Sequence, residues 1–294
     1  MLDFQPVKIS DRDLILDNIP ESSSQICDFS FGNIFCWSVG ENTRVAQQDG
    51  FLFLRSRFNG IKSYAFPWGK GDVRNALKII EEDAKERNAE LSFYCLSEEQ
   101  AEILKEIYGE GLELQEQRDF FDYVYPREKL ATLSGRKLHS KKNHVNAFCK
   151  KYSFSYEELN EGNLKECLEF SHQWHKGGER NPKLDEEMLV IEKAFEHFGE
   201  LHLSGALLRV DGRIVAYALG EAMPDGKTFC THFEKASPDY LTAYAVINKL
   251  FAENSLSEFE YINREDDAGV ENLRKAKNSY HPEHLVKKYY GKIL

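Results

Sequence analysis

The sequence predicts an α+β protein made of two halves that repeat one order of elements. Hydrophobic residues make up 41% of the 294-residue chain and charged residues 30%, which is typical of a folded globular protein. Apolar residues alternate in some segments and recur at helical spacing in others. These patterns follow one another in the same order twice, and a repeated order along a chain indicates a tandem fold.

The first half begins with a strand and two helices and continues with three strands. Their predicted ranges are 2–9 for the first strand, 11–18 and 29–38 for the helices, and 43–47, 51–58 and 62–66 for the three strands. Asp49-Gly50 and Asn59-Gly60 separate these three strands, and both dipeptides favour tight hairpin turns. The half ends with a helix, a strand, a helix and a long strand region, at 73–87, 91–95, 98–108 and 112–125.

The second half repeats this order. Its first strand is predicted at 153–157, its two helices at 164–175 and 185–197, and its three strands at 201–210, 214–221 and 228–234. Asp211-Gly212 and Asp225-Gly226 are the turns between these three strands. A helix, a strand, a helix and a terminal strand follow, at 240–252, 258–263, 270–277 and 285–290.

This order of elements is that of the GNAT acyltransferase fold, which has a mixed sheet that splays near its middle. We therefore expect two tandem GNAT-like domains, each a mixed sheet flanked by helices. The predicted ranges are 1–128 for the N-terminal domain, 129–152 for a basic linking helix and 153–294 for the C-terminal domain.

Composition also limits the class of protein and its location. The net charge of −11 argues against a surface that binds nucleic acid or anionic membrane everywhere. The longest uncharged apolar runs are far shorter than the ~20 residues of a membrane span, and no segment has the features of a signal peptide, so we expect a cytoplasmic protein. The six cysteines form no C-x-x-C pair, so reduced thiols are expected, with no metal site.

A basic segment interrupts this acidic chain. Residues 129–156 contain no acidic side chain, and Leu138, Val145 and Tyr152 recur every seven residues, which predicts an amphipathic helix. Its candidate binding residues are Lys137, Lys141, Lys142 and His144. Such a run can be a solvated face, or it can bind a partner that carries phosphate.

A polar turn follows the strand predicted at 258–263. Asn263, Arg264, Glu265, Asp266 and Asp267 lead into the next helix, which carries Arg274 and Lys277 one turn apart on one face. One interpretation is structural: Asp266 or Asp267 caps the helix, and the cations lie in solvent near its C-terminus. The other is functional, because ligand sites of sheet proteins often lie at strand-to-helix turns.

Several motifs occur together along the chain. They are Arg118-Asp119 with Asp122-Tyr123-Val124-Tyr125, Leu133-Ser134-Gly135-Arg136-Lys137-Leu138-His139 with Lys141-Lys142-Asn143-His144, His232-Phe233-Glu234-Lys235-Ala236, Ile262-Asn263-Arg264-Glu265-Asp266-Asp267 with Gly269, Leu273-Arg274-Lys275-Ala276-Lys277, and Ser279-Tyr280-His281-Pro282. With these motifs the chain resembles, over nearly its whole length, bacterial proteins of unknown function related to the C-terminal part of phosphatidylglycerol lysyltransferase. The resemblance implies a tandem GNAT-like fold, similar to enzymes that move an aminoacyl group from charged tRNA to an amine or hydroxyl acceptor.

Acyl transfer needs an acceptor held beside an activated carbonyl and a route for the proton. His232 and Glu234 alternate on one face of the strand predicted at 228–234, so they are candidate general bases, although Glu234 can instead pair with a nearby lysine. Asn263 and Glu265 complete the predicted catalytic set. The predicted substrate-binding residues are Arg264, Asp266, Asp267, Arg274 and Lys277, together with the basic residues above and, ranked second, Asp122 and Tyr123.

The nature of the acyl donor stays open. Coenzyme A enzymes of this fold bind pyrophosphate with a glycine-rich loop before a helix, but residues 235–243 contain no glycine and include Pro238 and Asp239. A tRNA-borne donor is therefore the first hypothesis. The alternatives are a coenzyme A dependent N-acetyltransferase, with acyl-CoA as its cofactor, and a non-catalytic module that binds RNA or an anionic surface through residues 136–151.

Overall fold

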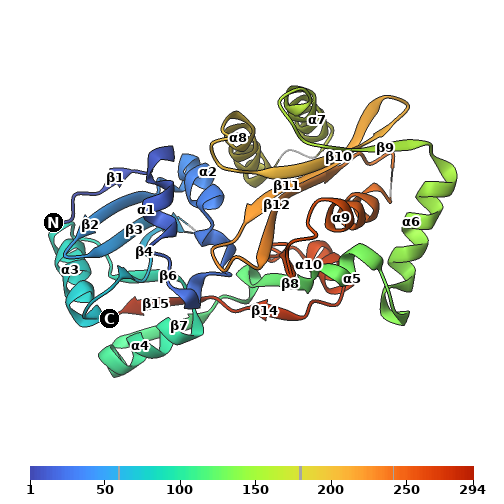
Figure 1. Ribbon diagram of the computed structural model, residues 1–294. Helices are drawn as coiled ribbons and strands as arrows, with labels where there is room; N and C mark the ends of the chain where they lie inside the picture. The colour runs from blue at the N-terminus through green and yellow to red at the C-terminus, as the bar shows by residue number, and fades with distance from the viewer. Residues whose placement is uncertain (59, 179–180, 241) are drawn as a thin grey trace. The chain divides into compact units, whose positions relative to one another are not determined.

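The computed structural model describes residues 1–58, 60–178, 181–240 and 242–294, and these residues divide into two compact units. The first unit contains Met1–Asp122 and Val286–Leu294, and the second contains Tyr123–Leu285. Each unit is built on its own sheet with flanking helices (Figure 1). The predicted α+β class with two mixed sheets is confirmed.

The sheet of the first unit has the strand order β1-β2-β3-β4-β6-β15-β7, with β5 paired to β3. The strands are β1 (Gln5–Pro6), β2 (Arg44–Gln48), β3 (Phe51–Phe58), β4 (Ile61–Tyr64), β5 (Trp68–Gly69), β6 (Ser92–Leu96), β7 (Leu112–Glu116) and β15 (Tyr289–Ile293). β4 and β6 run parallel, with Tyr64 opposite Phe93. The parallel step makes the sheet mixed.

The helices of the first unit are α1 (Arg12–Leu16), α2 (Phe31–Glu41), α3 (Val73–Glu86) and α4 (Glu98–Tyr108). α4 begins where Ser97 and Gln100 cap each other's backbone N–H groups, as a capping box does. The core of the unit lies between helices and sheet and includes Leu77 and Ile80 of α3 and Phe53 and Phe93 of the sheet. These apolar faces explain why the periodic segments fold as predicted.

The sheet of the second unit has the order β14-β8-β13-β12-β11-β10-β9. The strands are β8 (Asp122–Pro126), β9 (Phe154–Glu158), β10 (Ser204–Val210), β11 (Arg213–Ala222), β12 (Thr228–Ala236), β13 (Tyr261–Asn263) and β14 (His284–Val286). β9 to β12 form an antiparallel run, and β12 then pairs with β13 in parallel, with Cys230 opposite Asn263. This parallel step brings the polar end of β13 beside β12.

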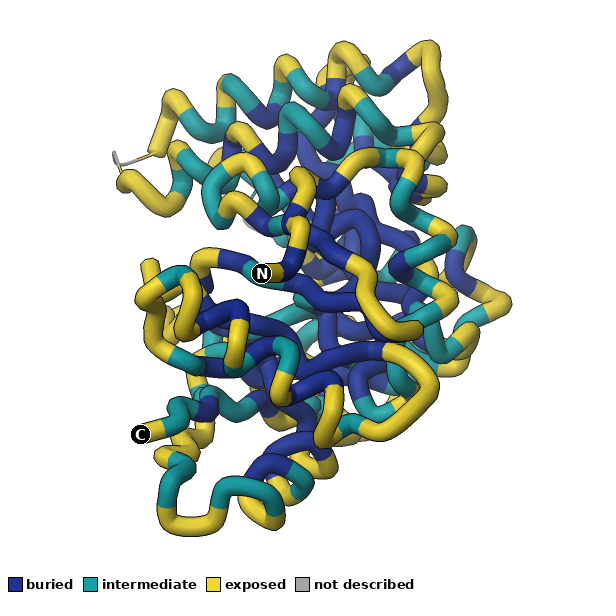
Figure 2. Tube along the Cα trace, turned by 90° about the vertical axis from the view of Figure 1, so that its left-hand side faces the viewer, coloured by how far each residue is buried: buried dark blue, intermediate teal, exposed yellow. Residues whose placement is uncertain are grey.

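The helices of the second unit are α5 (Arg127–Thr132), α6 (His139–Lys151), α7 (Leu164–Gly177), α8 (Pro182–Glu196), α9 (Ala243–Asn254) and α10 (Glu271–Asn278). α7 and α8 lie on one side of the sheet and α9 on the other (Figure 1). The strands are mostly buried, whereas the helices expose their outer turns (Figure 2). In the described residues, no helix is long and apolar enough to cross a membrane.

Two of the four predicted hairpin turns have the expected geometry. Asp49 and Gly50 have φ of 51° and 79°, and Asp211 and Gly212 have φ of 49° and 76°, as two-residue hairpin turns with positive φ require. Asp225-Gly226 lies in a longer loop, in which the Asp225 carboxylate accepts the backbone N–H groups of Lys227 and Thr228. Of the fourth turn, Asn59 lies outside the described residues.

Two predicted strand regions were wrong in their extent. The region 112–125 is divided into β7 and β8, which lie in different sheets and are separated by a 3₁₀ turn at Arg118–Phe120. The terminal strand at 285–290 is likewise divided into β14 and β15. The reason is long-range pairing: β15 inserts between β6 and β7, with Tyr290 opposite Gln115.

The compact units follow sheet membership, so their bounds differ from the predicted ranges 1–128, 129–152 and 153–294. Within the basic segment, Leu130, Leu138, Val145 and Phe148 are buried in the core of the second unit. Its helix is also interrupted. Gly135, with φ of 90°, lies between α5 and α6.

Candidate active site in the second unit

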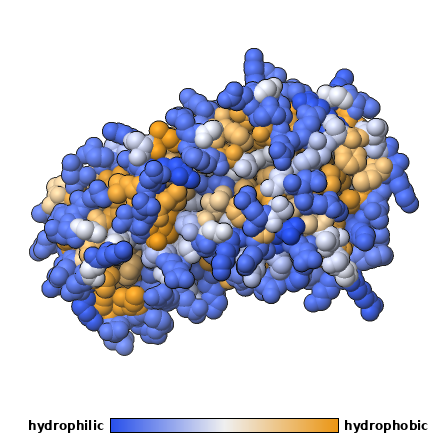
Figure 3. Space-filling model, viewed as in Figure 1, coloured by the Kyte–Doolittle hydropathy of each residue, from blue (hydrophilic) through white to orange (hydrophobic). Residues whose placement is uncertain are grey.

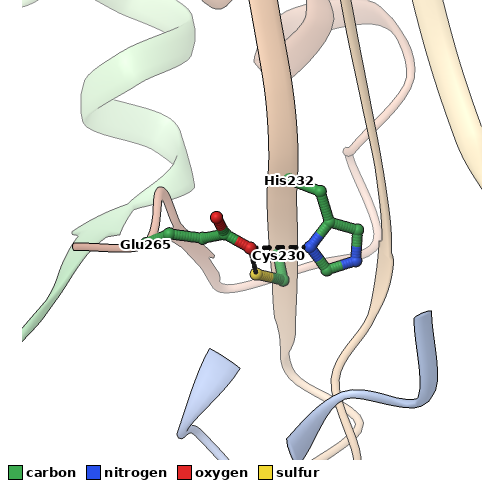
Figure 4. Close-up of side chains that lie close together, drawn as sticks. All are labelled: Cys230, His232 and Glu265. Atoms are coloured by element: carbon green, nitrogen blue, oxygen red, sulfur yellow. Dashed lines mark hydrogen bonds and ion pairs between the residues drawn. The ribbon is translucent and has the colours of Figure 1, made fainter. Parts of the chain in front are cut away.

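A buried histidine on β12 lies between two carboxylates. Nδ1 of His232 is 2.8 Å from Oε1 of Glu265, and Nε2 is 3.1 Å from Oε1 of Glu221. The Cys230 sulfur lies 3.7 Å from the same Glu265 oxygen (Figure 4). The side chains of His232 and Glu221 are each 3% exposed, whereas that of Glu265 is 21% exposed. Glu265 is therefore the member of this cluster that solvent reaches most easily.

A β-bulge places His232 in this position. Thr231 pairs with Gly220 and Phe233 pairs with Leu219, so His232 is the extra residue of β12. Gly220 permits the close approach of the two strands, because a Cβ at this position would lie 1.8 Å from the carbonyl oxygen of Cys230. The bulge breaks the regular alternation from which His232 and Glu234 were predicted to share a face.

The two carboxylates fix the protonation state of His232. Both ring nitrogens face a carboxylate oxygen, and an imidazole can donate from both nitrogens only when it is charged. Burial opposes this charge, but the Cys230 sulfur and the hydrogen bonds to Glu221 and Glu265 raise the pKa of His232 well above its ordinary value. His232 thus holds its proton in this arrangement, which does not favour the predicted role of general base.

The polar turn after β13 is ordered by the buried side chain of Asn263. Its Oδ1 accepts the backbone N–H of Glu265 at 2.7 Å, and Glu265 has a left-handed backbone with φ of 57°. Asn263 therefore positions Glu265 toward His232. The structure brings together three of the four residues predicted as catalytic, His232, Asn263 and Glu265.

The carboxylate of Asp267 is fully buried within the turn and accepts several hydrogen bonds. Its Oδ1 accepts from the backbone N–H of Gly269 at 3.0 Å and from Nη2 of Arg274 at 2.7 Å. Its Oδ2 accepts from the Tyr123 hydroxyl at 2.6 Å and from Nε of Arg274 at 2.9 Å. Neither Asp266 nor Asp267 caps α10, because that helix begins only at Glu271.

The remaining cations of the turn also bind the protein itself. Nζ of Lys277 donates to the carbonyl oxygens of Arg264 and Asp266. Arg264 donates from Nε and Nη2 to one oxygen of Glu234, at 3.0 and 2.5 Å. Nη1 of Arg264 and Oε1 of Glu234 are buried and have no hydrogen-bond partner in the described part of the chain.

Aromatic rings border the Arg264–Glu234 pair. The Arg264 guanidinium lies 5.0 Å from the ring centre of Tyr280, and the Lys141 ammonium lies 4.4 Å from the same ring centre. Burial and the nearby Arg264 charge lower the pKa of Lys141. Lys141 of the basic helix thus reaches the region of the polar turn.

The other predicted basic residues lie on the outer surface of α6 and just before it. Lys137, Lys142 and His144 are exposed, whereas Leu138, Val145 and Phe148 are buried. The edge of the molecule where α6 lies in Figure 1 is lined by hydrophilic side chains in the same view (Figure 3). This exposure suits contact with an anionic partner.

The first unit contains a second buried charge cluster, which includes Asp122. Nζ of Lys288 donates to Oδ1 of Asp122 at 2.7 Å, donates to the carboxylate of Asp28, and lies 3.4 Å from Sγ of Cys27. Burial opposes the charged form of Lys288, but the two carboxylates raise its pKa well above the ordinary value. Asp122 and Tyr123, predicted as neighbours in one site, thus have separate partners in different compact units.

Sequence reasoning missed several members of these clusters. Glu221 and Cys230 lie on β11 and β12, and only the strand pairing with its bulge brings them to His232. Lys288 was missed because its carboxylate partners are more than one hundred positions away in the chain. A local signal was present for Glu221, which lies in an otherwise apolar strand segment.

Residues 21–291 match the family described as the C-terminal part of phosphatidylglycerol lysyltransferase. Among solved structures, a conserved protein of unknown function from Bacteroides thetaiotaomicron is 33% identical, with a TM-score of 0.94 and 100% of each chain covered.

Two more distant structures share the fold. L-PGS from Bacillus licheniformis is 14% identical, with a TM-score of 0.61 over 88% of this chain and 90% of that chain. FemX is 11% identical, with a TM-score of 0.60 over 100% of this chain and 98% of that chain. The predicted tandem GNAT-like fold is confirmed. Because its match spans residues 21–291, the chain belongs to the phosphatidylglycerol lysyltransferase C-terminal family.

Proposed function

We propose that the protein is an acyltransferase that moves an aminoacyl group from charged tRNA to an amine or hydroxyl acceptor. The observation that carries this proposal is family membership over residues 21–291, since the family is described by the transfer of a lysyl group. The reaction breaks the ester between the aminoacyl carbonyl and the terminal ribose of tRNA. It forms an amide or a new ester, and one proton passes from the acceptor to the ribose oxygen. The charged tRNA places this reaction in the cytoplasm.

The proposed reaction centre lies between β12 and the polar turn after β13. Glu265 is the proposed proton acceptor, because its carboxylate is the most exposed of the cluster and can meet an incoming amine or hydroxyl. His232, which also contacts Glu221, forms a hydrogen bond with this carboxylate, and Asn263 fixes the Glu265 backbone. The partly exposed Asp266 adds negative charge that attracts a cationic amine.

The Arg264–Glu234 pair is the proposed contact for the polar part of a substrate. The buried Nη1 of Arg264 can donate a hydrogen bond and the buried Oε1 of Glu234 can accept one, and neither has a partner among the described residues. A group that both donates and accepts, such as an amide or a hydroxyl, satisfies the two together. Leaving them unsatisfied costs free energy, so a bound group is favoured there.

The loop before α9 supports a tRNA-borne donor over coenzyme A. Pyrophosphate binding requires backbone N–H groups that point to the ligand. In the described part of this loop, the N–H of Ser237 donates to Val215, that of Tyr240 to Ser237, and that of Ala243 to Tyr240, at 2.8, 3.0 and 2.8 Å. These donors are already used within the protein.

The proposed contact for the tRNA backbone is the exposed surface around α6. Lys137, Lys142 and His144 are exposed, and residues 129–156 contain no acidic side chain to offset them. Phosphate contacts of this kind give binding that weakens steeply with salt. The same surface also supports the second candidate function, a module that binds RNA without catalysis.

The test is a transfer assay with purified protein, radiolabelled aminoacyl-tRNA and a panel of soluble amines and hydroxyl compounds. We expect acceptor-dependent release of the label from tRNA, and we expect Glu265→Gln to abolish turnover while tRNA binding persists. The matched control is Glu271→Gln, an exposed glutamate on α10. Salt-sensitive RNA binding without turnover for any acceptor indicates the non-catalytic module, and a rise in melting temperature with coenzyme A indicates the acetyltransferase.

A further inference from the structure

Two groups of side chains in the described residues bring metal-binding atoms together. One group is Cys230, His232 and Glu265, and the other is Cys27, Asp28 and Asp122. In the second group, the Lys288 ammonium already lies among the three ligands, 2.7 Å from Asp122 and 3.4 Å from Cys27. The protein's own cation therefore fills that position.

We propose that Cys230, His232 and Glu265 bind one Zn²⁺ ion. Their ligand atoms all lie within 4.8 Å of one another, and the Cys230 sulfur is 3.7 Å from Oε1 of Glu265. Tetrahedral zinc, with metal–ligand distances of about 2.0 to 2.3 Å, places sulfur and oxygen ligands about 3.6 Å apart. The sulfur and the carboxylate already have the spacing that zinc requires.

The imidazole and the carboxylate need only a small adjustment. Nδ1 of His232 is 2.8 Å from Oε1 of Glu265, whereas nitrogen and oxygen ligands of tetrahedral zinc are about 3.4 Å apart. The Glu265 side chain is 21% exposed and extends from a loop, so it can make this shift by rotation. His232 and Cys230 stay fixed by their positions on β12.

Glu221 lies where a carboxylate usually supports a metal-binding histidine without binding the metal itself. A metal-binding histidine usually donates its other ring N–H to a carboxylate or carbonyl, which fixes the ring and makes it a better ligand. Nε2 of His232 is 3.1 Å from Oε1 of the buried Glu221, so Nδ1 is the nitrogen that faces the three-ligand site. The Glu221 carboxylate, the His232 ring and the three ligand atoms are thus in the order found at zinc sites.

The combination of sulfur, nitrogen and oxygen ligands indicates which metal the site would bind. Thiolate, imidazole and carboxylate together suit zinc, whereas magnesium and calcium prefer oxygen ligands alone. Zinc displaces the proton on Nδ1 and the proton of the Cys230 thiol, and both are released to solvent. Three protein ligands leave a fourth position for water or a substrate atom. Zinc would take Oε1 of Glu265, so the other carboxylate oxygen, Oε2, is the one left for the proposed proton transfer. The expectation of no metal site came from sequence spacing, which cannot show ligands contributed by a strand and a distant loop.

The test uses purified full-length protein loaded with zinc or cobalt and then desalted. We expect about one zinc per chain by elemental analysis, as three-ligand sites bind a single ion. With cobalt, we expect a thiolate-to-metal charge-transfer band that is lost in Cys230→Ser and in Glu265→Gln. Glu221→Gln should lower zinc affinity about 10- to 100-fold, as loss of an outer carboxylate does. Cys149→Ser, an exposed cysteine on α6, is the matched control and should keep the band.

The proposal is overturned if the loaded protein retains no zinc, or if Cys230→Ser keeps the charge-transfer band. Glu265→Gln decides the question should Cys230→Ser fail to fold, because this glutamate is partly exposed. The readouts are metal content and spectra and do not involve aminoacyl transfer. Failure of zinc binding is therefore distinct from failure of the proposed reaction.

Discussion

Replacing Asp267 with asparagine should destabilise the second unit strongly. Each of its two oxygens accepts two hydrogen bonds: Oδ1 from Gly269 and Arg274, and Oδ2 from Tyr123 and Arg274. Whichever way the new amide is turned, its NH₂ group faces two donors. The side chain keeps its size, so the loss is electrostatic and is not caused by a cavity.

The size of the effect follows from the burial of the partners. Removing one partner of a buried ion pair costs about 3 to 5 kcal/mol. Asp267 is fully buried, but the Arg274 side chain is 33% exposed and regains part of its hydration. We therefore expect a loss of about 3 kcal/mol, at the lower end of that range.

Urea unfolding followed by far-ultraviolet circular dichroism measures this loss. With a denaturant dependence of about 3 kcal/mol per molar, the transition of the second unit should move down by about 1 M urea. Glu271→Gln is the matched control, since it also replaces a carboxylate by an amide. Its pair with Lys275 is exposed and is worth about 0.3 to 0.5 kcal/mol. The reasoning is refuted if Asp267→Asn unfolds at the same urea concentration as Glu271→Gln.

The Asp267→Asn variant also tests how the stability of the second unit depends on pH. Burial alone would raise the pKa of Asp267, but the Arg274, Tyr123 and Gly269 hydrogen bonds outweigh burial and hold it below 3.8. A lowered pKa gives stability that is fully present above the unfolded value and is lost as pH falls through the folded value. The difference between wild type and Asp267→Asn should be constant from pH 6 to 8 and narrow below about pH 4. A difference that persists unchanged in acid contradicts this assignment.

Three further predictions concern other parts of the chain. Lys288→Met should lower the free energy of unfolding of the first unit by about 3 to 5 kcal/mol, because the fully buried Asp122 and the partly buried Asp28 lose their cation; urea unfolding checks this. Gly220→Ala should destabilise the second unit, since its Cβ would lie 1.8 Å from a backbone oxygen across the bulge, and a melting temperature equal to wild type would contradict the bulge. Lys137→Ala with Lys142→Ala should reduce the salt dependence of tRNA binding by about 1 per lysine, measured by filter binding, with stability within about 0.5 kcal/mol of wild type. Unchanged salt dependence would place the tRNA elsewhere.

Elements with strong local patterns were predictable. β3 was predicted at its observed bounds, as was α4, whose Ser97 capping box marks its start. The two Asp-Gly hairpin turns also followed from local chemistry, because both residues adopt positive φ. Local patterns do not encode long-range pairing. For this reason the separation of β7 from β8, and of β14 from β15, was not foreseen.

The sequence predicted the region in which the candidate site lies, but it did not predict which side chains contact one another there. Sequence reasoning brought His232 and Glu265 to one region, and the structure places them 2.8 Å apart. It missed Glu221 and Cys230, because the β-bulge changes which strand residues are neighbours. Sequence reasoning interpreted Asp267 as a possible helix cap or substrate contact. In the structure this side chain is buried, and its carboxylate accepts hydrogen bonds from the protein itself.

The position of β15 has a consequence for how the chain folds during synthesis. The second unit is one continuous segment, Tyr123–Leu285, and its sheet can form before β15 is made. The first unit needs β15, which lies between β6 and β7, and it also needs Lys288 to neutralise its buried carboxylates. Proteins are made from the N-terminus, at about 5 to 20 residues per second. The part of this protein that is translated first is therefore the last to be completed.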